Sequence, residues 1–198
     1  MEPLKPITRQ LRRVAVRLGG VCVLAWLALA AHGAEIHARN PYDVIANYLH
    51  QFRNNLQWPA PAWGTNTSPW RIGILGDDPF GESLVQVLKK YPVAGRGFEI
   101  IHAAKAEDLR TCDIVYLAAK DEAKVTAALT ALAGRPILTV GEADNFLKLG
   151  GIIRMEIGDH VHISINLDQA RAAGLKISAG MLEGAVQIIE DGKLKKKK

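Results

Sequence analysis

The chain has 198 residues, of which 48% are hydrophobic and 23% are charged, and its formal net charge is +5. This composition fits a globular protein with one substantial core rather than a disordered chain. The positive charge lies at the two ends. Between residue 34 and the terminal KLKKKK, 15 Lys plus Arg face 19 Asp plus Glu, so the body lacks the clustered basic groups that nucleic-acid binding needs.

Residues 1–33 have the pattern of a secretory signal peptide. Basic residues precede an apolar run, VCVLAWLALAA, and small residues follow it. Ala31 and Gly33 are suitably placed for cleavage before Ala34. An uncleaved anchor is the alternative, but this run falls well short of the ~20 apolar residues that span a bilayer. We therefore expect export and cleavage near Ala34.

An amphipathic helix is predicted over residues 41–58, where apolar residues recur at helical spacing, and a proline-rich connector over 59–70. From residue 71, strands and helices alternate, which is typical of a parallel sheet with right-handed crossovers. Strands are expected at 71–75, 97–103, 113–119 and 135–140, and helices at 79–91, 106–112, 121–134 and 142–150.

Residues 150–167 break this alternation. Apolar and polar residues alternate on either side of Gly158 and Asp159, which predicts a β-hairpin at an edge of the sheet. A helix over 167–174, an extended piece over 175–178 and a last helix over 179–189 should follow. We expect a single-domain α/β protein, a Rossmann-like or flavodoxin-like three-layer sandwich with a mostly parallel sheet and this C-terminal hairpin at its edge. A disordered basic tail is expected at 191–198.

The stretch RIGILGDDPFGESL places a glycine-bearing turn between a strand and a helix, where many α/β proteins bind phosphate. Gly76 and Gly81 have the spacing of a Walker loop, but Glu82 occupies the lysine position. Asp78 occupies the second glycine position of the dinucleotide motif. Asp78 and Pro79 fit the N-cap and first residue of a helix instead, so we predict a helix start and no nucleotide site.

The remaining reactive side chains indicate no enzyme, cofactor or metal. Ala118 and Ala119 end the middle strand, where a phosphoacceptor domain requires aspartate. His160 and His162 share one face of the hairpin, but no Cys, Asp or Glu cluster completes a metal site. Cys112 is the one cysteine left after cleavage. It precedes an apolar strand, which favours a buried, unpaired core thiol.

From residue 71 to about residue 189 the chain resembles the YfiR/HmsC-like family of small bacterial periplasmic regulators. The carrying segments are IGILGDDPFG, AGRGFEI, CDIVYLA, ILTVGEADNFLKLGGIIRMEI and ISINLDQARAAGLKISAGML, and the helix before QWP is also similar. The resemblance implies a periplasmic repressor that restrains the sensory region of an inner-membrane diguanylate cyclase, controlling cyclic-di-GMP and biofilm formation. It also implies a cysteine partner for Cys112 where this chain has Gly73, so that bridge cannot close here.

Contacts with a partner or ligand are expected at the carboxyl ends of the strands, on the hairpin at 150–167 and in the extended piece at 175–178. The candidate residues are Asp77, Asp78, Glu142, His162, Ser164, Asn166, Lys176 and Ser178. The lysines from Lys193 to Lys198 would add weak attraction to an anionic membrane. A small periplasmic solute-binding module is the alternative function. A structural envelope protein and a homodimer are left open.

Overall fold

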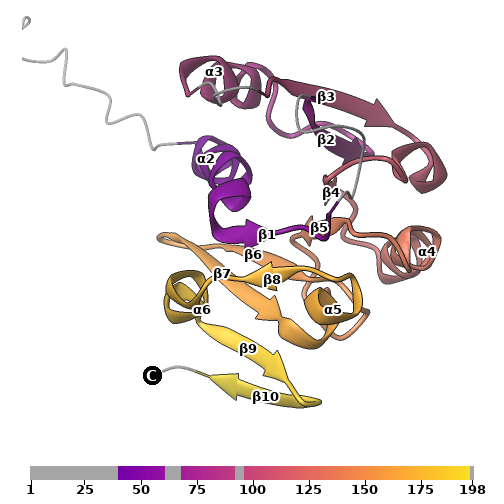
Figure 1. The fold of residues 1–198 in the computed structure, drawn as a ribbon, viewed down its shortest axis with the longest axis vertical. Helices are drawn as coiled ribbons and strands as arrows, with labels where there is room; N and C mark the ends of the chain where they lie inside the picture. The colour runs from indigo at the N-terminus through magenta and orange to yellow at the C-terminus, as the bar shows by residue number, and fades with distance from the viewer. Residues whose placement is uncertain (1–39, 61–67, 92–95, 197–198) are drawn as a thin grey trace, which may run out of the picture. The chain divides into compact units, whose positions relative to one another are not determined.

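The computed structural model describes residues 40–60, 68–91 and 96–196. The expected signal peptide and residues 61–67 of the expected connector lie outside this part of the chain. The described residues belong to one compact unit, Arg39–Lys198. Its centre is an eight-stranded sheet with the order β10-β9-β7-β6-β5-β4-β2-β3, and a second sheet pairs β1 with β8 (Figure 1).

Helix α2 (Pro41–Asn55) opens the described chain. It begins here because the Asn40 side chain accepts a hydrogen bond from the Tyr42 amide at 3.1 Å and proline occupies the first helical position. Its apolar face is buried, with Ile45 and Leu49 fully inside. The helix passes directly into β1 (Leu56–Gln57), which pairs antiparallel with β8 (Lys176–Ile177).

The parallel half of the sheet confirms the predicted alternation. Its strands are β2 (Trp70–Leu75), β3 (Phe98–Ala103), β4 (Ile114–Leu117) and β5 (Leu138–Gly141). The connections contain α3 (Glu82–Lys90), the 3-10 helix η1 (Ala106–Leu109) and α4 (Glu122–Leu132).

The helix expected at 142–150 is instead a run of turns. Phe146 is fully buried there, and its ring lies over Gly141 and Gly151, where any Cβ would collide with it. Because the ring sits against bare backbone on both sides, the segment folds tightly around Phe146 rather than continuing as a helix.

Strands β6 (Ile153–Ile157) and β7 (Val161–Asn166) form the predicted antiparallel hairpin. Helix α5 (Leu167–Ala172) follows, also as expected. The last helix, predicted over 179–189, is shorter than expected: α6 spans Ala179–Gly184. The prediction is wrong for Gln187–Glu190, which forms strand β9, parallel to β7. The β6–β7 hairpin is therefore inside the sheet rather than at its edge.

The prediction of a disordered tail at 191–198 is also wrong for Lys193–Lys196. These residues form edge strand β10, antiparallel to β9. Acidic groups offset the repulsion among its lysines. Glu190 lies 2.6 Å from the Lys195 ammonium, and the Asp168 carboxylate accepts hydrogen bonds from the amides of Asp191 and Gly192 in the β9–β10 turn, each at 2.9 Å. Helix α5 thus holds the last hairpin through its turn.

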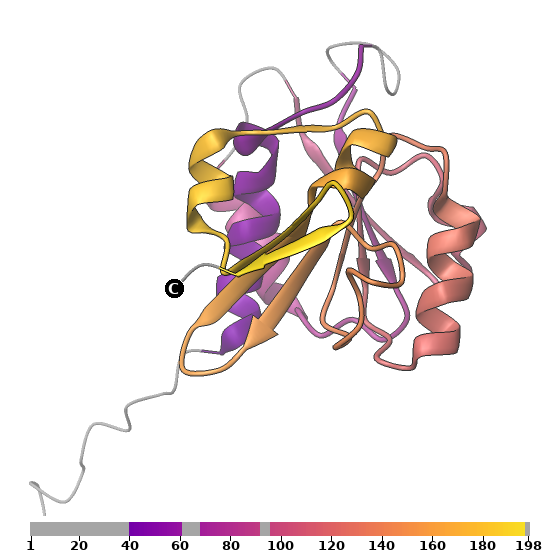
Figure 2. The ribbon, with the colours of Figure 1, turned by 90° about the horizontal axis from the view of Figure 1, so that it is seen from below.

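The sheet buries both faces, as the apolar strand runs predict. One core lies between the sheet and the helices α2, α3 and α6; the other lies against η1, α4 and the turn around Phe146. Figure 2 shows α2 and α6 on one side of the strands and α4 on the other. Successive side chains of β4 point to opposite faces of the sheet, so Tyr116 lies in the first core and Val115 in the second.

Candidate functional site

A crevice opens at the carboxyl ends of β2 and β4. The chain leaves β2 through α3 on one face of the sheet and returns from β3 to β4 through η1 on the other. Such a topological switch point is where open α/β sheets bind ligands. The crevice has a volume of about 690 Å³ and is lined by the loops after β2, β3, β4 and β5 and by one face of α4.

Small side chains keep the crevice open. Helix α4 turns Lys124, Ala127, Ala128 and Ala131 toward it, at the i, i+3, i+4, i+7 spacing of one helix face. Four further alanines line it from the strand ends: Ala104, Ala106, Ala118 and Ala119. These alanines contribute only short side chains, so much of the wall is apolar and leaves the space open.

The β2–α3 loop differs from its predicted form. The side chain of Asp78 accepts a hydrogen bond from the Phe80 amide at 2.7 Å, and its other oxygen lies 2.8 Å from Nε2 of His102. The resulting turn buries Phe80 and delays α3, whose N-cap is Gly81 at φ 52°. The prediction of Asp78 as N-cap is therefore wrong. Asp77 remains exposed and lines the crevice.

Glu142, directly after β5, is the most enclosed acidic group of the crevice. Its side chain is 9% exposed; it accepts a hydrogen bond from the Tyr116 hydroxyl and lies 3.3 Å from the Lys120 ammonium. Burial, then the hydrogen bond and charge of Glu142, raises the pKa of Tyr116, so this hydroxyl stays a donor. Burial and Glu142 also raise the pKa of Tyr42.

Sequence reasoning named Glu142 but missed Tyr42, Tyr116 and Lys120. Tyr116 gave one signal, because a tyrosine within the solid apolar run IVYL needs a partner for its hydroxyl. Nothing in the sequence indicated that this partner follows the next strand.

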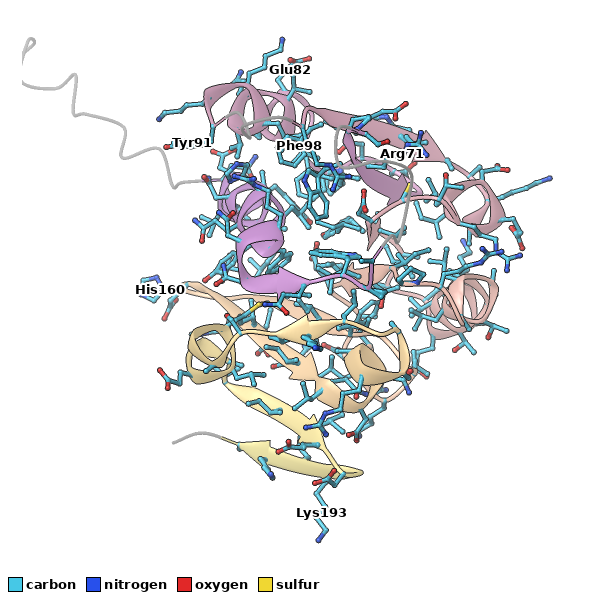
Figure 3. The ribbon with its side chains drawn as sticks, in the orientation of Figure 1. Arg71, Glu82, Tyr91, Phe98, His160 and Lys193 are labelled. Carbon is cyan, nitrogen blue, oxygen red and sulfur yellow. The ribbon has the colours of Figure 1, made fainter. Side chains whose placement is uncertain are left out.

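The other predicted contact residues do not line the crevice; they lie on β7, on β8 and at the start of α6. His162 on β7 and Lys176 on β8 are exposed. Ser164 is 1% exposed, and its hydroxyl has no hydrogen-bond partner within the described part of the chain. His160 lies at the tip of the β6–β7 hairpin and Lys193 at the start of β10 (Figure 3). The eight candidates therefore do not form one site.

Asn166 and Ser178 make hydrogen bonds within the fold and cap helices. The Asn166 amide donates to the carbonyl of Leu147 at 2.9 Å, and its oxygen accepts from the amide of Gln169 at 3.0 Å, capping α5. Ser178 caps α6 by accepting from the Met181 amide at 3.3 Å. These polar groups are already occupied within the fold, so the INLDQARAAGLKIS segment mainly anchors the second half of the sheet.

Cys112 is fully buried, as predicted, and unpaired. Burial, followed by the charge of Asp113, raises the pKa of its thiol to about 12, so the thiol is protonated at neutral pH. A Cβ placed on Gly73 would lie 3.0 Å from the Cys112 sulfur. The position that the family resemblance assigns to a partner cysteine is thus adjacent to Cys112.

Within residues 40–60, 68–91 and 96–196, no three His, Cys, Asp or Glu side chains come together as metal ligands. None of the helices described there is long and apolar enough to cross a membrane.

The sheet order and the crevice define a doubly wound α/β domain with room for a small ligand at its switch point. A family model described as YfiR/HmsC-like matches residues 42–186. The match covers most of the chain, which therefore belongs to the YfiR/HmsC-like family. It begins within α2, so this helix is part of the family domain.

Two solved structures are similar at low sequence identity. A conserved domain protein from Vibrio cholerae O1 biovar eltor str. N16961 matches with a TM-score of 0.50 and 14% identity, over 75% of this chain and 60% of that chain. The ABC domain in complex with L-Trp from Streptococcus pneumonia matches with a TM-score of 0.48, at the same identity and coverage. This chain thus spans about three fifths of each, and the first match supports the α/β fold alone.

Proposed function

We propose that the protein is a periplasmic negative regulator that binds the sensory region of an inner-membrane diguanylate cyclase. By restraining the cyclase it lowers cyclic-di-GMP and biofilm formation. The observation that carries the proposal is the family match over residues 42–186, which extends across both cores of the domain. The signal-peptide pattern of residues 1–33 supports it, because an exported protein reaches the cyclase from the outer side of the membrane.

The protein acts in this proposal by binding, without catalysis. A regulator that binds the inactive state of the cyclase more tightly than the active state shifts the population toward the inactive state. The shift is limited by the difference between the two affinities. Release of the protein then restores cyclic-di-GMP synthesis.

Partner contacts are proposed at exposed positions of β7, β8 and β10. His162 on β7 and Lys176 on β8, the strand that pairs with β1, are exposed, whereas Ser164 and Asn166 are buried. Strand β10 is one edge of the sheet and carries exposed lysines. An edge strand offers backbone groups for pairing, and its lysines favour approach to an anionic membrane surface near the cyclase.

The crevice favours a second candidate function, a small periplasmic solute-binding module. Its volume of about 690 Å³ lies within the range of small-molecule sites, and it occupies the position where α/β sheets bind ligands. The two functions are compatible, because a ligand in the crevice would give the regulator a signal to sense.

Gene deletion tests the regulator proposal. We expect cyclic-di-GMP and surface attachment to rise in the deletion strain, and the rise to vanish when the partner cyclase is also deleted. The purified protein should bind the periplasmic region of that cyclase. A His162→Ala, Lys176→Ala double variant should bind more weakly than a control variant, Lys148→Ala, at an exposed position in the turn after β5. Unchanged cyclic-di-GMP together with no binding would leave the solute-binding function as the better explanation.

A further inference from the structure

The crevice between β2 and β4 is lined by both charged and apolar side chains. Glu142 and Tyr42 lie close together, the alanines of α4 and of the strand ends form the apolar wall, and four further charged residues also line it: Asp77, Lys105, Glu107 and Lys124. Because the Glu142 side chain is 9% exposed, its carboxylate has little contact with water. A carboxylate in such a place is favourable when a positive charge accompanies it.

The ammonium of Lys120 occupies the position beside Glu142 where a positive charge is favourable. This ammonium lies 3.3 Å from one oxygen of Glu142, and the other oxygen accepts the Tyr116 hydroxyl. The Lys120 side chain is 69% exposed, so it reaches the carboxylate from solvent. An ion pair made by an exposed, flexible lysine is weak, and another ammonium can replace it.

Two tyrosines, Tyr42 and Tyr116, lie beside Glu142. The ring of Tyr42 lines the crevice, edge to face with Phe80 at a centroid distance of 5.9 Å, and Phe80 contacts Tyr116 in the same way at 4.8 Å. The lining also carries Asp77 and Glu107 together with Lys105 and Lys124. Lys120 is the internal cation that a ligand ammonium must replace at Glu142.

We propose that the crevice binds a small organic cation, a protonated primary amine carried on an apolar body. Its ammonium replaces that of Lys120 on Glu142 beside Tyr42, and its apolar body lies along Ala127 and Ala131 of α4. This inference rests on the second candidate function, small-molecule binding by the crevice, and it holds whether or not the protein binds a cyclase.

Three probes with the same six-carbon chain test the choice of a cation. Hexylamine, hexan-1-ol and hexanoate are titrated into the purified protein by calorimetry at neutral pH and constant ionic strength. We expect hexylamine to bind at least about tenfold more tightly than hexan-1-ol, because a charge-assisted hydrogen bond to a carboxylate is stronger than a neutral one. Equal affinities overturn the proposal. Tighter binding of hexanoate also overturns it and makes Lys105 and Lys124 an anion site.

Substitutions locate the site. Glu142→Gln should remove the preference for hexylamine over hexan-1-ol, whereas Lys120→Gln should strengthen hexylamine binding several-fold, because the internal competitor is gone. Lys148→Gln, at an exposed position in the turn after β5, is the matched control and should change neither value. A merely structural role for Glu142 would lower the melting temperature without changing the preference between the two probes.

A second pair of variants keeps the test decisive if Glu142→Gln does not fold. Ala131→Leu fills the wall of the crevice and should weaken hexylamine binding at least about tenfold. Ala123→Leu lies on an exposed position of the same helix and should leave binding unchanged. If Lys120→Gln and Ala131→Leu both leave hexylamine binding unaltered, the site is not in this crevice. These titrations contain no cyclase, so their failure is separate from failure of the regulator proposal.

Discussion

The contact between Gly73 and Cys112 predicts that one substitution will introduce a disulfide into this core. A Cβ on Gly73 would lie 3.0 Å from the Cys112 sulfur. In a disulfide, the S–S bond of about 2.04 Å places the Cβ of one cysteine about 3 Å from the sulfur of the other. We therefore expect Gly73→Cys, in a Cys22→Ser background, to form this bond during oxidative refolding.

The magnitude follows from the loop that the bond closes. Residues 73–112 form a loop of about 40 residues, for which the chain-entropy model gives about 4 kcal/mol of stabilisation. The new Cβ also lies 2.9 Å from Cδ2 of Leu109, and moving that fully buried side chain costs about 1–3 kcal/mol. Relative to the wild type, a net gain of about 1–3 kcal/mol remains.

Gly73→Ser is the matched control, because it introduces similar crowding without a bond. At about 2–4 °C per kcal/mol, the oxidised cysteine variant should melt up to about 8–16 °C above the serine variant, and reductant should abolish the difference. Thermal unfolding by circular dichroism measures this. Oxidation belongs in the refolding step, because burial raises the pKa of Cys112 to about 12 and the folded thiol is unreactive. Two titratable thiols after refolding, or no rise in melting temperature, would refute the reasoning.

Three further predictions concern the turns that shape the sheet. Gly151→Ala should destabilise the protein by about 3 kcal/mol in urea unfolding, because its Cβ would meet the buried Phe146 ring. Gly158→Ala should change little, because its Cβ would make only an ordinary contact, 3.8 Å from the His160 carbonyl oxygen. Hydrogen bonds from the Gly192 and Asp191 amides lower the pKa of Asp168 in the folded state. The stability that this carboxylate adds is therefore present above its ordinary pKa of about 4 and is lost as the pH falls through the lower folded value. The difference in free energy of unfolding between wild type and Asp168→Asn should narrow between pH 7 and pH 3. Deleting residues 193–198 should lower the melting temperature by a few degrees through loss of β10, and an unchanged value would contradict the pairing of β10 with β9.

The parallel half of the sheet was predictable because its signals are local. The runs RIGIL, DIVYLAA and RPILTV are apolar and rich in β-branched residues, and amphipathic or alanine-rich segments separate them. Strand β9 was not predictable in this way. Two residues lie between α6 and residues 187–190, and their partner β7 is separated from them along the chain by α5, β8 and α6. Pairing between distant segments leaves no mark on local periodicity.

The candidate site divides in the same way. The position of Asp77 at the end of β2 could be inferred, because parallel strands bring their carboxyl ends to one edge of the sheet. The cluster around Glu142 could not, since Tyr42 comes from α2 and Tyr116 from β4. The sequence also gave no means of separating exposed His162 from buried Ser164, two residues further along the same strand.

The way α2 is built into the domain bears on the order in which the chain becomes stable. Leu49 and Phe52 share a core with Ile163 and Met181, and β1 pairs with β8. A chain exported with its N-terminus first would present α2 on the far side of the membrane long before these partners arrive. An isolated helix of this length is marginal in water. Helix α2 would therefore stay unfolded until nearly all of the domain has crossed. An unfolded chain can pass through the translocation channel, but it is exposed to chaperones and proteases if the last strands do not emerge.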